Sequence, residues 1–403
     1  MIIQPAKRTE SVQEYYFSRK LKEIASMNAQ RAASGDDPVI NLGIGSPDGM
    51  PPMPAVAALC ESAARPGNHA YQSYVGLPEL REAFAKWYRD WYGVTLDTKT
   101  QIQPLVGSKE AILLISLAFL DKGDKVLVPD PGYPTYSSAS KLVEAEIVTY
   151  DLCESNGWQP DFDALEKMDL SGVKIMWTNY PNMPTGASAS EELYAQLVTF
   201  GRKHGILICN DNPYSFILND SPVSILSQPG AMECCLELNS LSKAHNMAGW
   251  RIGMVAAEAE VISQILKVKS QMDSGMFKPL QLAAVEALSQ GKEWFRELND
   301  EYRRRRVIAG EIFDILGVSY EEDSAGMFLW GKVGDVNTGA DQAGLSVGQV
   351  LSDRILYKAG VFITPGFIFG KNGEGYIRIS LCAKPETLRI AAEKIRANIA
   401  EIL

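Results

Sequence analysis

The chain lacks the charge balance of a nucleic-acid-binding protein. Its 403 residues include 39 Lys and Arg against 49 Asp and Glu, a formal net charge of −10. A polyphosphate partner normally requires a clustered basic face. The one dense basic run, residues 303–306, lies in an acidic helical stretch, where a solvated helix face is expected. No nucleic-acid partner is therefore predicted.

Long hydrophobic runs and cysteine motifs are also scarce. The longest nearly apolar run, residues 111–120, is much shorter than the ~20 residues of a membrane-spanning helix. Residues 1–5 have neither the basic start nor the apolar stretch of a secretory signal. The six cysteines show no Cys-x-x-Cys spacing, and the three histidines show no metal-like spacing. We therefore expect a cytoplasmic protein with reduced cysteines, no membrane partner and no metal site.

Apolar residues are plentiful, and their order along the chain predicts the fold class. Hydrophobic residues make up 46% of the composition, enough for a large core. Short apolar runs alternate with helical or loop segments at residues 125–128, 146–149, 173–177, 206–209, 235–238 and 253–256. This alternation predicts an α/β protein with a mostly parallel sheet covered by helices on both faces.

The two ends of the chain predict a second, smaller unit. Residues 258–313 are almost wholly helical in pattern, and strands at 326–330, 361–364 and 376–380 follow, with helices at 347–359 and 385–403. A capping box at Ser11-x-x-Glu14 opens a helix that runs to Gly35. The expected organisation is an N-terminal helix and part of the small domain at 1–45, a large domain at 46–290 and a small α+β domain at 291–403.

The most informative motif follows the predicted strand at 235–238. It reads Ser240-x-Ser242-Lys243, with Arg251 eight positions after the lysine and Gly253 two positions further on. A primary amine can form a reversible Schiff base with an aldehyde, and desolvation together with a nearby cation keeps the amine partly neutral. The whole motif resembles the lysine signature of the fold type I, pyridoxal-phosphate-dependent aminotransferases of class I/II.

That resemblance implies both a fold and a reaction. It implies a large domain with a mostly parallel seven-stranded sheet between helices, a smaller α+β domain, and a homodimer with shared active sites. The activity would be ping-pong transfer of an amino group from an L-amino acid to a 2-oxo acid. In it, Lys243 holds pyridoxal 5′-phosphate as a Schiff base and moves the substrate proton, while Ser240 and Arg251 bind the phosphate.

Further segments match the same family in order along the chain. Asp211-x-x-Tyr214 closes a predicted strand and resembles the pair that protonates the pyridine nitrogen and donates to the phenolic oxygen. Both are expected to be catalytic. Tyr133 matches the aromatic residue that stacks on the cofactor ring.

The phosphate site has two further expected parts. Gly107-Ser108-Lys109 opens a buried helix, whose free N–H groups suit a phosphate. Tyr71 leads a Tyr-x4-Gly-x3-Leu-Arg segment, and in the family this tyrosine reaches the phosphate of the neighbouring subunit.

Two residues match the substrate site, and one position departs from the family. Gly45 matches a loop that approaches the substrate carboxylate, and Arg378 matches the arginine that grips that carboxylate. The usual Pro-Asn-Asn-Pro-Thr-Gly segment has Met183 in place of its second Asn. A thioether cannot donate a hydrogen bond. Either Asn182 binds the cofactor's phenolic oxygen instead, or that hydrogen bond is absent.

The sequence leaves the amino donor, the oxo-acid acceptor and one rival reaction open. A β-eliminating lyase of the C–S lyase type uses the same fold and site. Tyr15, Tyr16 and Phe17 either close over the substrate or pack onto the core, and packing is the favoured interpretation.

Overall fold

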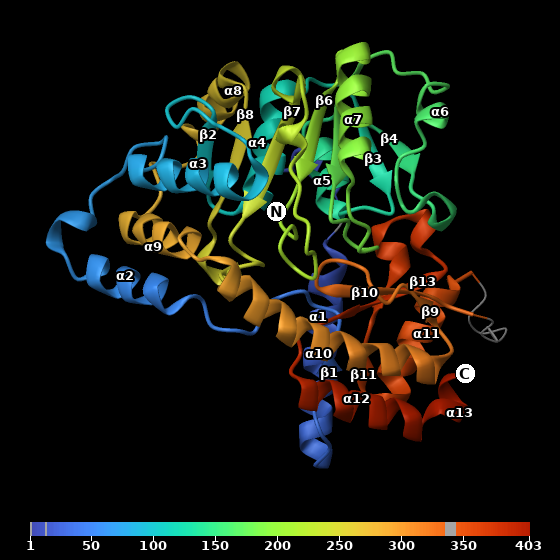
Figure 1. Ribbon diagram of the computed structural model, residues 1–403. Helices are drawn as coiled ribbons and strands as arrows, with labels where there is room; N and C mark the ends of the chain where they lie inside the picture. The colour runs from blue at the N-terminus through green and yellow to red at the C-terminus, as the bar shows by residue number, and fades with distance from the viewer. Residues whose placement is uncertain (1, 13, 335–343) are drawn as a thin grey trace.

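The computed structural model describes residues 2–12, 14–334 and 344–403, and their helices and strands form two regions (Figure 1). The large region holds a seven-stranded sheet and forms the upper part of the view. The small α+β region lies below it and contains most of the C-terminal third of the chain. The predicted α/β class with a smaller α+β domain is confirmed.

The large sheet has the order β2-β8-β7-β6-β5-β3-β4. Four of its six neighbouring strand pairs are parallel, whereas β8 runs antiparallel to both β2 and β7. The strands are β2 (Ile102–Leu105), β3 (Lys125–Asp130), β4 (Glu146–Asp151), β5 (Val173–Asn179), β6 (Leu207–Asp211), β7 (Cys235–Ser240) and β8 (Gly253–Ala257). The parallel strands end at one edge of the sheet, which is where ligands bind in such folds.

Helices cover both faces of this sheet because its strands are apolar on both sides. In β3, Val126 and Val128 pack into one core cluster with α4 and α8, while Leu127 packs into the other cluster with α3 and α7. The helices of this region are α2 (Met53–Ala63), α3 (Pro78–Tyr92), α4 (Ser108–Phe119), α5 (Pro134–Leu142), α6 (Phe162–Leu165), α7 (Glu191–His204), α8 (Ala259–Lys269) and α9 (Lys278–Leu288).

The small region is built on a four-stranded antiparallel sheet of order β12-β13-β10-β9. Its strands are β9 (Ser319–Tyr320), β10 (Phe328–Lys332), β12 (Thr364–Pro365) and β13 (Tyr376–Ser380). The helices are α10 (Lys292–Leu316), α11 (Val347–Arg354), α12 (Pro385–Ala397) and α13 (Ile399–Ile402). Figure 1 shows α10 running from the large region along the small one.

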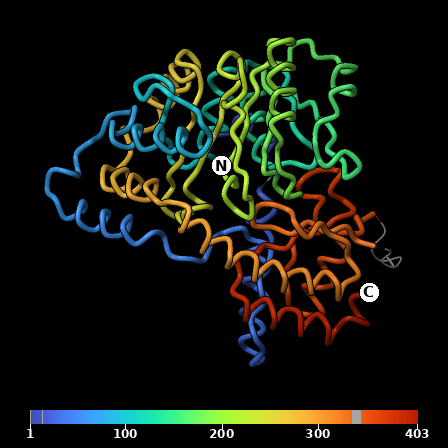
Figure 2. The backbone as a smooth tube through the Cα atoms, in the orientation of Figure 1, coloured from blue at the N-terminus to red at the C-terminus, as the bar shows by residue number. Residues whose placement is uncertain are grey.

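The N-terminal helix packs with residues of the small region. Ile24 of α1 (Tyr16–Ser34) packs with Leu356 and Phe362 in a separate apolar cluster. Strand β1 (Ile40–Asn41) pairs in parallel with β11 (Val361–Phe362). The two ends of the chain therefore lie side by side, blue against red in Figure 2.

Two expectations about the elements are wrong. The capping box is not formed: α1 begins at Tyr16 without a side-chain cap, and Ser11 Oγ donates instead to the Arg8 carbonyl oxygen. The strand expected at 361–364 is divided into β11 and β12, whereas the mostly helical stretch expected at 258–313 is present as three helices, α8, α9 and α10. Strand β2 was not predicted. Within the described residues, no helix combines the length and apolarity that crossing a membrane requires.

Candidate active site

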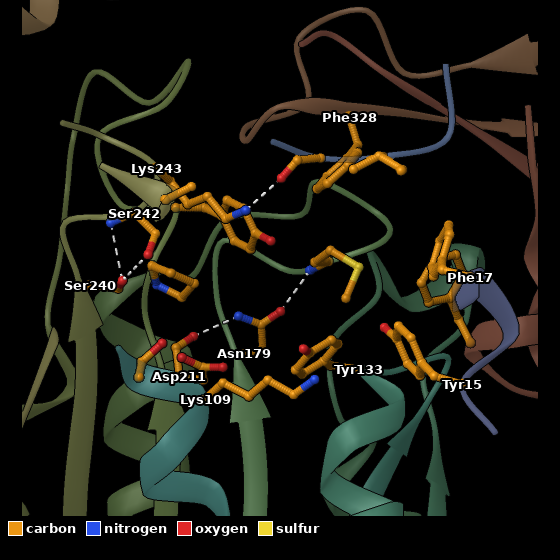
Figure 3. A pocket seen from close by; sticks show the side chains of 18 of the residues that line it. Tyr15, Phe17, Lys109, Tyr133, Asn179, Asp211, Ser240, Ser242, Lys243 and Phe328 are labelled. Atoms are coloured by element: carbon orange, nitrogen blue, oxygen red, sulfur yellow. Dashed lines mark hydrogen bonds between the residues drawn. The ribbon is translucent and has the colours of Figure 1, made fainter. Parts of the chain in front are cut away.

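A cavity of about 610 Å³ lies where the ends of the parallel strands face the small region. Ten residues predicted from motifs far apart in the sequence line it. They are Gly45, Ser108, Lys109, Tyr133, Asp211, Tyr214, Ser240, Lys243, Arg251 and Arg378. Figure 3 shows several of them converging on the same space.

Asp211, the last residue of β6, contributes a buried carboxylate to the cavity. Its Oδ2 accepts a hydrogen bond of 2.9 Å from the Tyr136 hydroxyl, while Oδ1 is buried and has no partner among the described residues. Burial raises the pKa of this carboxyl to about 7, against the lowering effect of the Tyr136 hydrogen bond. A cationic partner at Oδ1 would restore the charged form.

Lys243 follows β7 and is enclosed by the cavity wall. Its Nζ donates a 2.6 Å hydrogen bond to the Gly45 carbonyl oxygen, and the Tyr214 ring centroid lies 6.0 Å away (Figure 3). Desolvation lowers the pKa of the amine, and the charges of Arg378 and Arg251 act in the same direction. The amine is therefore poised toward its neutral, nucleophilic form. Burial raises the pKa of the Tyr214 hydroxyl, which remains a donor at neutral pH.

One end of the cavity combines a helix N-terminus with hydroxyls and a guanidinium. Ser108 is the first residue of α4, so its backbone N–H faces no intrahelical acceptor. Ser240 Oγ and Ser242 Oγ lie 2.9 Å apart, and Arg251 Nη1 lies 3.4 Å from Ser242 Oγ. Gly107 has a φ of +78°, and a Cβ there would overlap the Arg251 guanidinium. These groups form an electropositive cradle that suits a phosphate.

Arg378 occupies the opposite end and is 4% exposed. Its Nη2 donates to the Gly43 carbonyl oxygen at 2.8 Å, its Nη1 lies 3.1 Å from Met183 Sδ, and Nε has no partner among the described residues. Burial lowers its pKa to about 10, so the guanidinium stays charged at neutral pH. A carboxylate entering the cavity would find this cation only partly engaged.

Three predicted cofactor contacts do not line the cavity. Asn182 is buried, but its Oδ1 accepts from Thr185 and its Nδ2 donates to the Asn179 carbonyl oxygen. The expectation that Asn182 binds the cofactor is therefore not supported, because the amide is used within its own turn. Gly107 leaves room for the Arg251 guanidinium, which a Cβ would overlap, and 91% of the surface of Tyr71 is exposed.

Several lining residues were missed because no motif marks them. Asn179 ends β5, and its Nδ2 donates to the Asp211 carbonyl oxygen at 2.6 Å (Figure 3). Phe328 and Phe369 come from the small region and carry no local signal. Tyr136 also lies outside every motif, whereas Met183, Pro213, Ser242 and Ala248 lie inside motif segments but were given no binding role.

The sequence left open whether Tyr15, Tyr16 and Phe17 close over the substrate or pack onto the core, and the structure differs among the three. Tyr15 and Phe17 line the cavity, so packing alone is wrong for them. Tyr16 packs edge-on against Phe367 at a centroid distance of 5.5 Å, as the packing interpretation predicts.

The chain is similar along its whole length to known enzymes. The family model "Aminotransferase class I and II" matches residues 37–395. An LL-diaminopimelate aminotransferase of Dehalococcoides mccartyi is 40% identical over 97% of each chain. Among solved structures, substrate-bound BacF from Bacillus subtilis is 33% identical, covers 98% of each chain and has a TM-score of 0.89. An aromatic aminotransferase from Pyrococcus horikoshii is 30% identical, with 90% of this chain and 96% of that chain covered and a TM-score of 0.82.

Nothing in these comparisons favours a lyase. The chain belongs to the class I and II aminotransferases and is a pyridoxal-phosphate-dependent aminotransferase.

Proposed function

We propose that Lys243, Asp211 and Tyr214 are the catalytic residues of this aminotransferase and that the cavity between them holds the cofactor. When bound, pyridoxal phosphate supplies an aldehyde that condenses with amines and a protonated ring that accepts an electron pair. The observation that carries the proposal is the buried, unpartnered Oδ1 of Asp211 in the same cavity as the Lys243 amine. That oxygen fits a protonated ring nitrogen, since a cation there would stabilise the carboxylate.

The electropositive cradle fits the cofactor phosphate. Ser108 would offer its backbone N–H and hydroxyl, Lys109 its backbone N–H, and Ser240 and Arg251 their side chains. Tyr133 would contact the ring face, and Tyr214 would donate to the phenolic oxygen. Each of these groups lines the cavity, which supports its assignment to the cofactor site.

At the other end, Arg378 would bind the substrate α-carboxylate beside the Gly45 backbone. An arginine fork matches a carboxylate with two parallel hydrogen bonds, and burial strengthens the pairing. This contact orients the substrate Cα toward the cavity centre. Lys243 Nζ is then the base that takes the Cα proton and later returns a proton, because its pKa is lowered by desolvation.

Replacement of Lys243 tests the proposed centre. We expect Lys243→Ala to lose the visible absorption of the holoenzyme and at least about 10³-fold of the rate of 2-oxo acid formation. Absorption spectra and an oxo-acid assay measure both effects. Lys267→Ala, at an exposed position on α8, is the matched control and should behave as the natural protein does. A fully active Lys243→Ala enzyme would overturn the assignment.

We further propose that the working enzyme is a homodimer whose partner supplies Tyr71. Tyr71 and Tyr74 are exposed on one loop, and Met272 and Phe277 are exposed on a neighbouring one. Phe277 packs against His69 with ring centroids 5.9 Å apart, which joins the two loops. Gln103 Nε2 of β2 donates to the Tyr74 carbonyl oxygen, and Gly107 of the electropositive cradle follows Gln103 by four residues. An exposed apolar surface near a ligand site is typical of a subunit interface.

Domain boundaries and location remain proposals of the same kind. Boundaries near residues 45 and 290 fit the pairing of β1 with β11 and the start of α10 at Lys292. A cytoplasmic location is supported by the six cysteines, which are all free. Amino acids and 2-oxo acids are the expected small-molecule substrates.

A further inference from the structure

We infer that the substrate side chain lies against an apolar wall made largely of aromatic rings, and that the preferred amino donors carry apolar or aromatic side chains. The inference rests on the proposed function, because it takes Arg378 as the site of the α-carboxylate. We call the set Tyr15, Phe17, Ile44, Phe328 and Phe369 the aromatic wall.

The aromatic wall surrounds the arginine expected to fix the substrate. The Arg378 Cζ lies 3.9 Å from the Phe328 ring centroid, 4.7 Å from that of Phe369 and 5.8 Å from that of Phe17. A substrate held by this guanidinium would therefore lie close to phenyl rings. Figure 3 shows Phe328 on one side of the cavity and Phe17 and Tyr15 on another.

The charged groups of the cavity are already assigned or engaged. Within the described residues, the charged lining consists of Lys109, Asp211, Lys243, Arg251 and Arg378. The last four belong to the proposed catalytic centre, the phosphate cradle and the α-carboxylate site. Lys109 Nζ lies 5.2 Å from the Tyr15 ring centroid and 5.9 Å from that of Tyr133, within the range of cation–π attraction. The residues of the aromatic wall carry no charge themselves, so Lys109 is the one cation beside the wall, among the described lining residues, whose side chain has no other assigned role.

The rings are held by the fold. Phe328 opens β10, where it pairs with Ser380 of β13. The Phe369 carbonyl oxygen accepts a 2.8 Å hydrogen bond from the Gly132 N–H, next to Tyr133. Because these backbones are fixed, the wall can bind an apolar side chain without ordering new segments.

The aromatic wall does not suit LL-diaminopimelate, the compound in the name of the similar LL-diaminopimelate aminotransferases. LL-diaminopimelate carries a second ammonium and a second carboxylate at the far end of its side chain. Placing both against phenyl rings would remove them from water without replacement hydrogen bonds, which is unfavourable. A phenyl or branched aliphatic side chain gives up no hydrogen bonds when it is buried on the same surface, so its transfer from water is favourable. The wall thus favours apolar donors over doubly charged ones.

Two unreactive carboxylates test the wall without catalysis. 3-Phenylpropionate presents a phenyl group, and pimelate presents the second carboxylate of diaminopimelate on a chain of matching length. Titration calorimetry of the holoenzyme should show 3-phenylpropionate binding about ten- to a hundredfold more tightly. Equal affinities, or tighter binding of pimelate, would overturn the inference.

Truncation of one ring links the binding preference to turnover. We expect Phe369→Ala to lower kcat/KM for L-phenylalanine about tenfold and to weaken 3-phenylpropionate binding similarly. The loss for L-alanine should be several-fold smaller, because its methyl group does not extend along the wall. Phe162→Ala is the matched control, since Phe162 packs against Phe200 and does not line the cavity.

The donor panel separates this inference from the proposed function. L-phenylalanine, L-leucine, L-glutamate and LL-diaminopimelate are compared by kcat/KM with pyruvate as acceptor, since each donor then gives a 2-oxo acid that differs from the acceptor. A preference for LL-diaminopimelate would refute the aromatic wall as the selective surface and leave the aminotransferase centre intact. If the panel gave no oxo acid while 3-phenylpropionate still bound selectively, the catalytic assignment would fail and the wall would stand.

Discussion

Met183 places a thioether where the family usually has a hydrogen-bond donor. Its sulfur lies 3.1 Å from Arg378 Nη1, and the neighbouring Asn182 amide is engaged within its turn. Tyr214 is then the remaining donor expected for the cofactor's phenolic oxygen. Fewer hydrogen bonds to a deprotonated oxygen stabilise the charged form less, so its conjugate acid titrates at higher pH.

This reasoning predicts a spectroscopic difference at one residue. The visible absorption band of the Met183→Asn holoenzyme should titrate at a lower pH than that of the natural protein, because the amide supplies a donor. Met183→Leu, which has no donor, should titrate as the natural protein does. A pH titration followed by absorbance measures all three proteins. Identical midpoints for the Asn variant and the natural protein would refute the hydrogen-bond argument.

His245 is a buried imidazole without a hydrogen-bond partner among the described residues. Both ring nitrogens are unpartnered, and the ring packs against Trp87 and Phe295 at centroid distances of 5.9 and 5.5 Å. Burial lowers its pKa to about 3. Between that pH and the unfolded value of about 6.5, the unfolded chain binds a proton that the folded protein does not. The titration of His245 therefore leaves the free energy of unfolding unchanged above about pH 6.5. It lowers the free energy of unfolding as the pH falls from 6.5 toward 3.

His245→Phe should therefore be less sensitive to acid than the natural protein. Removing an unsatisfied buried polar group favours the folded state by about 1–3 kcal/mol, and the gap should widen as the pH falls from 7 to 5. Urea unfolding midpoints at both pH values measure the effect. His69→Gln, at an exposed site, serves as the control. A gap that stays constant with pH would contradict the titration argument.

The residues predicted from sequence are those whose chemistry is encoded locally. Ser240, Lys243 and Arg251 lie within one loop, so their spacing alone carries the pattern. Tyr136 and Asp211 meet from positions 75 residues apart, and no spacing rule links them. Phe328 and Phe369 reach the cavity only because the small region packs on the large one. Lining residues outside a local motif had no signal in the chain, even where tertiary structure places them beside residues that a motif marks.

At the scale of elements, Asp130 at the end of β3 links the large region to the small one through hydrogen bonds. Asp130 Oδ2 and Oδ1 accept 3.0 Å hydrogen bonds from the backbone N–H groups of Lys371 and Asn372. A Cβ at Gly370 would overlap this carboxylate. The same loop carries Phe369, so the Asp130 contact positions part of the aromatic wall.

Weakening this contact should loosen the wall as well as the fold. In Asp130→Asn, one acceptor is replaced by an amide donor facing an N–H group, which should cost about 1–3 kcal/mol of stability. KM for L-phenylalanine should rise with little change in kcat, because Asp130 acts through the position of Phe369. Urea unfolding and steady-state kinetics measure the two effects. Asp151→Asn is the control, because Asp151 accepts from the Asn372 side-chain amide and not from the backbone N–H groups that Asp130 binds. Its effects on stability and KM should be smaller. An unchanged KM in a destabilised Asp130→Asn enzyme would assign the contact to stability alone.

Elements with strong local signals were predicted well, and a weak one was not. The apolar runs expected as strands at 125–128 and 235–238 are present as β3 (Lys125–Asp130) and β7 (Cys235–Ser240). Strand β2 has only four residues and contains Gln103 and Pro104. It pairs with β8 alone, so proline is tolerated at this edge of the sheet. The order of the strands depends on long-range pairing and was not predictable from periodicity.

For the whole molecule, the net charge of −10 contrasts with a net positive charge in the lining of the cavity. Lys109, Lys243, Arg251 and Arg378 line the cavity against a single carboxylate, Asp211, among the described residues. A concave site with this balance attracts phosphate and carboxylate groups from a distance. The acidic exterior therefore does not oppose the binding of anionic ligands at the centre.

The proposed dimer makes the active site a property of two chains. Tyr71 lines no part of its own cavity, so Tyr71→Ala should reduce activity at least about tenfold only if the residue acts across an interface. Its effect on the stability of the single chain should be small, because 91% of its surface is exposed. Steady-state kinetics and urea unfolding distinguish these two effects.

Mixing two inactive variants provides the decisive measurement. In a heterodimer of Tyr71→Ala and Lys243→Ala chains, one site receives the intact Lys243 of one chain and the intact Tyr71 of the other. Random reassociation should restore about a quarter of the natural activity, since half the dimers are mixed and each has one complete site. Lys243→Ala mixed with Asp211→Ala is the control, because both residues belong to the same chain's site and cannot complement. Absence of recovery in the first mixture, with dimers demonstrated by sedimentation, would exclude a shared site built on Tyr71.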